Sequence, residues 1–118
     1  MPPRDPADLI PLTPRTFHVL MSVAAAPRNG YEIMAAVEEN SAGAVRIGPG
    51  TLYEALHRLT GQGLLTEVRK GLSARTDGRN QRFYQLTAFG RRVLEAETAR
   101  LAGDLRLARG SGFAGDPS

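Results

Sequence analysis

The stretch that decides the fold spans residues 48–59 and reads Gly-Pro-Gly-Thr-Leu-Tyr-Glu-Ala-Leu-His-Arg-Leu. Its apolar residues recur at the spacing of a helix that packs on a core, namely Leu52, Ala55, Leu56 and Leu59. Because Pro is tolerated in the first turn of a helix, the Gly-Pro-Gly segment predicts a clean helix start. The opposite face would present Gly50, Thr51, Tyr53, Glu54, His57 and Arg58 to solvent. A buried apolar face and an exposed polar face suit a helix that enters a DNA groove, although an ordinary amphipathic surface helix has the same pattern.

The residues that follow predict a β-hairpin with a basic tip. Gly63 is a stop signal for the helix, and residues 64–70 and 82–86 both read as strands. The segment between them contains the turn-forming pair Asp77-Gly78 and no helical pattern. A helix followed by a basic hairpin is the plan of a winged helix–turn–helix domain. We therefore expect a mainly α fold with a small β-hairpin, in the α+β class.

Positive charge is concentrated on this predicted helix and hairpin. Residues 46–92 hold nine basic and three acidic side chains, whereas the whole chain has a formal net charge of only +3. Such clustering is the footprint of a phosphate-contacting surface, although a solvated basic face without a partner would look the same. The basic residues expected on the hairpin, or wing, are Lys70, Arg75, Arg79 and Arg82.

Composition and motif spacing argue against several protein classes. The 118 residues suffice for one domain with an appendage, and the absence of Cys excludes disulfides and thiolate metal sites. The two histidines, His18 and His57, have no metal-ligand spacing, and no phosphate-binding loop follows a strand. We therefore expect no enzyme activity, no cofactor and no metal. A cytoplasmic location is expected, because neither a signal peptide nor an apolar run of membrane-spanning length is present.

Four segments are expected along the chain. Residues 1–12 form an irregular N-terminal arm, and residues 13–86 form the winged helix–turn–helix domain. Residues 87–109 form a C-terminal dimerisation helix, and residues 110–118 form a disordered tail.

Two helices are expected before the candidate recognition helix. Thr13-Pro14 is a good helix start, with Thr as the N-cap, and the first helix is expected to continue to about residue 26. Residues 27–30 read as a turn and residues 31–40 as a second helix. The predicted buried stripe of the first helix comprises Phe17, Leu20, Met21 and Ala24.

Two local features keep alternatives open. Residues 45–47 are either a short strand beside the hairpin or part of the turn before the recognition helix. Tyr53 faces either DNA or the core, because a tyrosine can bury its ring and keep its hydroxyl in water. Tyr31 and Tyr84 are both expected in the core.

The C-terminal helix carries more apolar surface than its own domain needs. One stripe, which includes Phe89 and Val93, suffices to pack on the domain. A second stripe comprises Leu94, Leu101 and Leu105. Burying each leucine is worth roughly 1.5–3 kcal/mol, so we expect a twofold dimer through this helix. The alternative is that both stripes face one groove of the same monomer.

Several short motifs together resemble the PadR family of transcriptional regulators. They are Gly30-Tyr31-Glu32-Ile33, Gly48-Pro49-Gly50-Thr51-Leu52-Tyr53, Gly63-Leu64 and Arg82-Phe83-Tyr84-Gln85-Leu86-Thr87, with Leu56, Leu59 and Gly90. Their order and spacing match across about residues 10–107. The resemblance implies a winged-helix domain, a C-terminal dimerisation helix and a homodimer that represses transcription at a palindromic operator. Some members bind a flat small molecule, but the few aromatic residues here, with no Trp, give no support for such an effector.

The expected function is therefore sequence-specific binding of double-stranded DNA by a homodimeric repressor at an inverted repeat. Thr51 and Glu54 would lie deepest in the major groove, whereas His57 and Arg58 would reach phosphates at its edge. The wing arginines would meet the DNA backbone or the minor groove. A winged-helix protein-interaction adaptor is the alternative.

Overall fold

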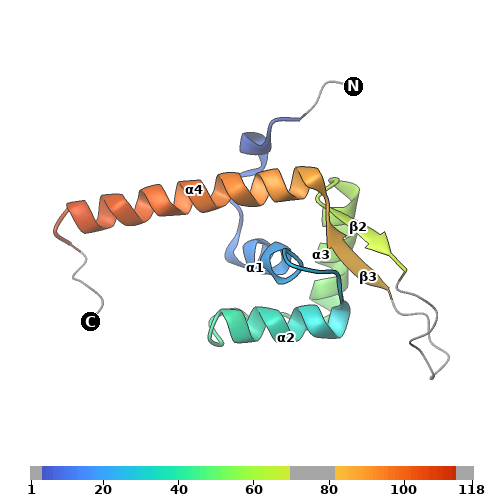
Figure 1. Cartoon of the computed structure of the whole chain (residues 1–118). Helices are drawn as coiled ribbons and strands as arrows, with labels where there is room; N and C mark the ends of the chain where they lie inside the picture. Colours follow the sequence, from blue (N-terminus) through green and yellow to red (C-terminus); the bar gives the residue numbers. More distant parts are fainter. Residues whose placement is uncertain (1–3, 70–81, 114–118) are drawn as a thin grey trace.

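The computed structural model describes residues 4–69 and 82–113, in which the helices pack together with a small antiparallel sheet at one side (Figure 1). The elements in chain order are the 3-10 helix η1 (Pro6–Leu9), α1 (Pro14–Ser22), β1 (Arg28–Asn29), α2 (Gly30–Asn40), α3 (Pro49–Gly61), β2 (Leu65–Val68), β3 (Phe83–Leu86) and α4 (Ala88–Gly110). This arrangement confirms the predicted winged-helix, α+β fold. The arm that was expected to be irregular contains η1, and most of the predicted tail lies outside the described residues.

The helix starts follow from capping residues in the sequence. The Thr13 hydroxyl accepts the Thr16 N–H at 3.1 Å, with Pro14 in the first turn of α1. At the start of α2 a full capping box joins Asn29 and Glu32. α1 ends at Ser22, four residues before the predicted end, and the chain then turns to reach β1.

The end of α3 explains a glycine that the sequence marks as a stop signal. Gly63 has a φ of +80°, in the left-handed region that favours glycine. The N–H of Gly63 donates to the carbonyl of Thr60, and the N–H of Leu64 donates to the carbonyl of Leu59, both at 3.0 Å. This Schellman pattern closes α3 and sends the chain directly into β2.

The sheet has three strands in the order β1-β3-β2, all antiparallel. β2 and β3 form the predicted hairpin, with Leu65 opposite Leu86 and Val68 opposite Phe83. The prediction of a simple turn at residues 27–30 is wrong, because Arg28 and Asn29 pair with Tyr84 and Phe83. Two residues are too few to show strand alternation in a sequence. Of the two readings of residues 45–47, the turn is confirmed.

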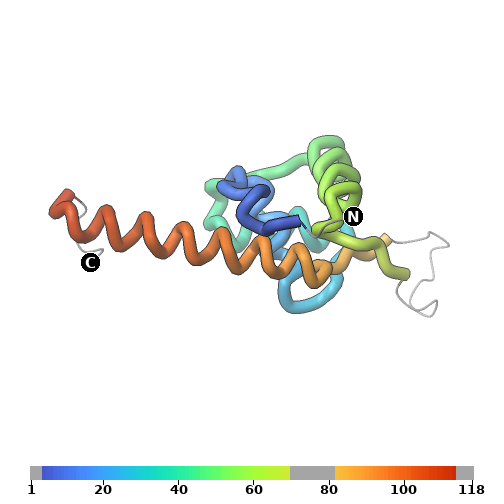
Figure 2. Tube along the Cα trace, turned by 90° about the horizontal axis from the view of Figure 1, so that it is seen from above, coloured from blue at the N-terminus to red at the C-terminus, as the bar shows by residue number. Residues whose placement is uncertain are grey.

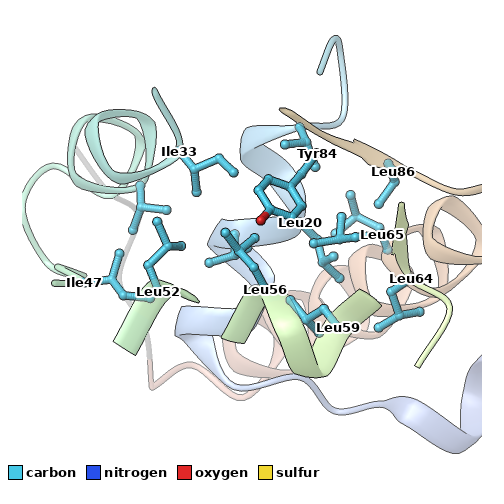
Figure 3. Close-up of a cluster of buried hydrophobic side chains, with 14 of the residues drawn as sticks. Leu20, Ile33, Ile47, Leu52, Leu56, Leu59, Leu64, Leu65, Tyr84 and Leu86 are labelled. Carbon is cyan, nitrogen blue, oxygen red and sulfur yellow. The ribbon is translucent and has the colours of Figure 1, made fainter. Parts of the chain in front are cut away.

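The core lies between α1, α2, α3 and the sheet, as the close-up in Figure 3 shows. The predicted stripe of α1 is partly wrong, since Met21 is 40% exposed and Phe17 is half-buried. The helix instead turns Val19 and Leu20 inward, and Val23 follows just after its end. The fully buried leucines of the core are Leu20, Leu52, Leu56, Leu59, Leu64 and Leu65.

α4 is 23 residues long, and its C-terminal half projects beyond the domain (Figures 1 and 2). The expectation that Leu94 lies in an exposed stripe is wrong, because Leu94 is buried in the core. Leu101 and Leu105 are 39% and 50% exposed, as expected. At 100° per residue, these three leucines lie on one face, so the second predicted stripe begins in the core at Leu94 and continues off the domain to Leu105. Among the described residues, no helix is long and apolar enough to span a membrane.

The N-terminal arm, residues 4–12, lies along α4 on the side away from α2 (Figure 1). Near its start, the Arg4 guanidinium lies 4.7 Å from the centre of the Phe89 ring and donates to the carbonyl of Gln62. At its end, the Leu12 N–H donates to the Glu97 carboxylate at 3.0 Å. The arm therefore contacts α4 at both ends and leads directly into α1.

Candidate nucleic-acid interface

The candidate recognition helix, α3, has the two faces that its sequence predicts. Leu52, Ala55, Leu56 and Leu59 are all buried. The residues predicted to face outward are all exposed, namely Gly50, Thr51, Tyr53, Glu54, His57 and Arg58. Helical geometry at 100° per residue puts Gly50, Glu54 and His57 opposite the buried face. Glu54, the acidic residue of α3, therefore lies on the solvent-facing side of the helix.

Tyr53 lies on the flank of α3 that faces the start of α2. A Cβ atom on Gly30 would lie 2.5 Å from the Tyr53 hydroxyl oxygen and 3.6 Å from Leu52, so glycine allows the hydroxyl end of Tyr53 to approach α2 this closely. The Tyr53 side chain is nevertheless 48% exposed. The hydroxyl end of Tyr53 thus packs against α2 while nearly half of the side chain stays in water, and a contact of Tyr53 with DNA stays a prediction.

The other two tyrosines differ from each other. Tyr84 is buried, as predicted, and burial raises the pKa of its phenol, with a smaller contribution from Glu67. The prediction that Tyr31 lies in the core is wrong, because Tyr31 is 73% exposed. Its neighbour Gly30 is the residue that contacts α3, so the first turn of α2 directs Tyr31 outward beside the recognition helix.

A groove of about 910 Å³ runs along the opposite flank of α3. It lies between the start of α1, the loop at residues 44–46 and the exposed face of α3. Arg58 reaches across it, and its guanidinium donates to the Thr16 hydroxyl at 3.4 Å. The groove is lined by Thr13, Pro14, Arg15, Thr16, Ala44, Val45, Arg46, Thr51, Glu54, Ala55, His57 and Arg58.

Two arginines of this groove were missed in the sequence, namely Arg15 and Arg46. Arg15 lies in the first turn of α1, and the exposed Arg46 guanidinium is 3.9 Å from Glu38, an ion pair of little energetic weight. Arg15 lies far from α3 along the chain, and only the fold brings the start of α1 beside it. Arg46 lies three residues before α3 and is counted among the basic residues 46–92, but its sequence context assigns it no contact. The sequence does place Arg15 beside the Thr13 cap of a predicted helix, and Arg46 beside the glycine-rich start of α3.

The base of the wing is described, but its tip is not. Arg82 is exposed, and its Nε atom lies 3.3 Å from the Glu67 carboxylate on the neighbouring strand. Because both side chains are largely in solvent, this ion pair is weak, and the Arg82 guanidinium can exchange Glu67 for another anion. Lys70, Arg75 and Arg79 lie outside the described residues.

The two histidines lie in different surroundings. His57 is exposed on α3, while His18 is half-buried with its ring edge-on to Phe17. Within residues 4–69 and 82–113, no three side chains of His, Cys, Asp or Glu gather to hold a metal ion.

Comparison with known proteins adds sequence evidence. The model of the PadR-like transcriptional regulator family matches residues 19–96. An uncharacterised 37.1 kDa transposon protein of Streptomyces fradiae is 42% identical over 88 residues, which cover 72% of this chain and 23% of that protein. A transcriptional regulator of Mycobacterium tuberculosis is 39% identical over 64 residues, which cover 54% of this chain and 56% of that protein. The chain thus spans about a quarter to a half of the length of these relatives.

Solved structures share the fold. A PadR family regulator of Clostridium difficile superposes with a TM-score of 0.67 and 20% identity, over 82% of this chain and 96% of that one. PadR of Bacillus subtilis, solved in complex with operator DNA, gives a TM-score of 0.58 and 20% identity, over 69% of this chain and 45% of that one. The family match covers the last turn of α1, all of α2 and α3, the sheet and the first residues of α4. The chain therefore belongs to the PadR-like family of transcriptional regulators.

Proposed function

We propose that this chain is a sequence-specific DNA-binding repressor that occupies an inverted-repeat operator as a homodimer. The observation that carries the proposal is the exposed polar face of α3, which lies beside an arginine-lined groove and is followed in the chain by the hairpin of β2 and β3. A helix presented in this way suits the major groove of DNA, with flanking cations for the phosphates. The operator complex of Bacillus subtilis PadR shows that a protein of this fold can bind DNA.

Each candidate residue has a role in this proposal. Thr51 and Glu54 read base edges, because they lie near the N-terminal end of α3, which enters deepest. Arg58 and His57 contact phosphates at the groove edge. The groove residues Arg15, Arg46 and Arg58 flank the path of one DNA strand. On the wing, Lys70, Arg75, Arg79 and Arg82 contact the adjacent backbone or minor groove.

The homodimer is supported by the free half of α4. Leu101 and Leu105 are exposed on one face. Beside them lies an apolar groove of about 400 Å³, which includes Met21 of α1, Leu94 and Ala102. A second copy of α4 packed across this face would bury the leucines and the groove together. Residues 13–86 then form the DNA-binding unit and residues 87–109 the dimerisation helix, and repression follows when the dimer covers promoter DNA.

The proposal predicts that Glu54 discriminates between sequences. Glu54→Ala should relax the preferred base at one position of each half-site, because a carboxylate accepts a hydrogen bond from cytosine and repels phosphate elsewhere. Affinity for random duplex DNA should hold or rise. Selection of bound sequences from a random duplex pool measures both effects.

A matched control for this variant is Glu39→Ala, which removes the same charge from the exposed side of α2. It should leave the selected sequence unchanged. Loss of all DNA binding by a folded Glu54→Ala protein would give Glu54 a structural role. Failure of the wild-type chain to select any sequence would instead favour a protein-interaction adaptor.

The wing arginines should contribute affinity without sequence preference. Arg75→Ala and Arg79→Ala are each expected to weaken binding to all duplexes by similar factors. Each should also reduce the slope of log affinity against log salt by about one per protomer, because phosphate contacts release counterions. Arg106→Ala, which removes a positive charge from the projecting half of α4, is the control. A changed sequence preference with an intact salt slope would show that the wing reads bases.

A further inference from the structure

α4 contains a buried carboxylate at the point where it leaves the domain. Glu97 is 1% exposed. Its oxygens accept the Leu12 N–H at 3.0 Å and two N–H groups of Arg100 at 2.7 and 2.9 Å. Arg100 hydrogen bonds hold the pKa of the Glu97 carboxyl below its usual range, so the group is charged at neutral pH. A buried charge is costly unless it is paired in this way.

Hydrophobic packing alone does not require this residue. The neighbouring turns of the same face of α4 carry Val93 and Leu94, both buried. A leucine at position 97 could fill similar space, but it could not accept the N–H of Leu12. The distinctive contribution of Glu97 is therefore to hold the end of the N-terminal arm against α4.

The arm connects α4 to the DNA-facing surface. Leu12 is followed by Thr13, whose hydroxyl caps α1 at Thr16. The Thr16 hydroxyl in turn accepts a hydrogen bond from Arg58 of α3. A continuous series of contacts thus leads from Glu97, through the start of α1, to the candidate recognition helix.

The direction in which α4 leaves the domain determines where its C-terminal end lies. From Glu97 to Gly110 the helix extends about 20 Å, at 1.5 Å per residue. A tilt of about 10° at Glu97 displaces its end by about 3.4 Å, which equals the rise per base pair of DNA. Small changes in the angle at which α4 packs on the domain would therefore change the distance between the two recognition helices of a dimer joined through α4.

We propose that Glu97 is a positioning residue that determines operator spacing. By holding the N-terminal arm against α4, it fixes the angle between α4 and α3, and hence the separation of the two half-sites that a dimer accepts. This inference rests on the proposed function, since it requires a dimer that binds two half-sites.

The test uses duplexes with identical half-sites and a spacer changed by one or two base pairs from the selected operator. The wild-type chain should lose about tenfold or more in affinity for each wrong spacing, because DNA or protein must deform to fit. Glu97→Leu should reduce this discrimination to about threefold or less, with single half-site affinity and dimer mass unchanged. Glu97→Gln retains an oxygen for the Leu12 N–H and should keep more of the discrimination.

Two further variants complete the design. Asp104→Asn removes the carboxylate that accepts a hydrogen bond from Arg100 on the side away from Glu97. The hydrogen bond between Leu12 and Glu97 does not involve Asp104, so spacing discrimination should be unchanged. Arg4→Ala loosens the exposed end of the arm and should broaden the accepted spacing even if Glu97→Leu fails to fold. If Glu97→Leu folds and still discriminates between spacings as the wild type does, the positioning role is overturned. If Glu97→Leu does not fold, wild-type discrimination by Arg4→Ala overturns it. Either result leaves the proposed function intact. A wild-type chain without spacing preference would contradict the proposed function itself.

Discussion

Replacing Leu101 and Leu105 together with Glu is expected to give a folded monomer that no longer binds its operator tightly. Both leucines are substantially exposed in the single chain, so the substitutions leave the domain core intact. In a dimer they would place four carboxylates in an apolar interface, where unpaired charge is very costly. Because two linked half-site contacts bind about 10²–10⁴-fold more tightly than one, operator affinity should fall by a factor in that range.

Light scattering measures the mass, and circular dichroism verifies the fold. Leu107→Glu is the control, because Leu107 is 72% exposed but lies on another side of α4. That variant should remain dimeric and bind the operator normally. An unchanged dimer mass for the double variant would place the dimer interface elsewhere on the chain.

Gly90→Ala is expected to be the most destabilising single methyl addition in the described chain. A Cβ atom at Gly90 would lie 2.2 Å from the Leu64 carbonyl oxygen and 2.9 Å from the Leu86 side chain. The Leu64 carbonyl is backbone and already accepts hydrogen bonds from Thr87, so it cannot move freely. We expect a loss of about 3 kcal/mol or more in the free energy of unfolding.

In thermal unfolding this corresponds to a fall in Tm of roughly 12–24 °C for a domain of this size. Gly103→Ala, in the same helix, is the matched control, since its nearest neighbour is 3.8 Å away. It should raise stability by about 0.4–1 kcal/mol, because alanine favours helix more than glycine. If Gly90→Ala unfolds at the wild-type temperature, α4 does not pack on Leu64 as described.

The sequence predicts those parts of the molecule whose pattern is local. The faces of α3 follow from the spacing of its four apolar residues, and the start of α1 follows from Thr13 and Pro14. The hairpin follows from two short runs of strand-forming residues. The helix features depend on residues within one or two turns of each other, and the hairpin depends on two runs that are consecutive strands in the chain, so no knowledge of the tertiary structure is needed.

What the sequence does not predict depends on residues that are distant along the chain. β1 exists because Arg28 and Asn29 meet β3, more than fifty residues later. The stripe of α4 divides into buried and exposed parts only because the domain ends near Glu97. Arg15 joins the candidate site because α1 starts beside α3. Tyr31 was misassigned because Gly30, rather than the aromatic ring, makes the contact with α3.

The contacts of the N-terminal arm also limit how far the chain can be shortened without loss of its fold. The family match begins at residue 19, inside α1, and ends at residue 96, one residue before Glu97. A protein shortened to that range would lose the Thr13 cap, the first turn of α1, and both partners of the Leu12–Glu97 hydrogen bond. Boundaries drawn from similarity therefore fall within the folding unit, and a stable shortened chain has to retain residues 4–18 and the turn of α4 that carries Glu97 and Arg100.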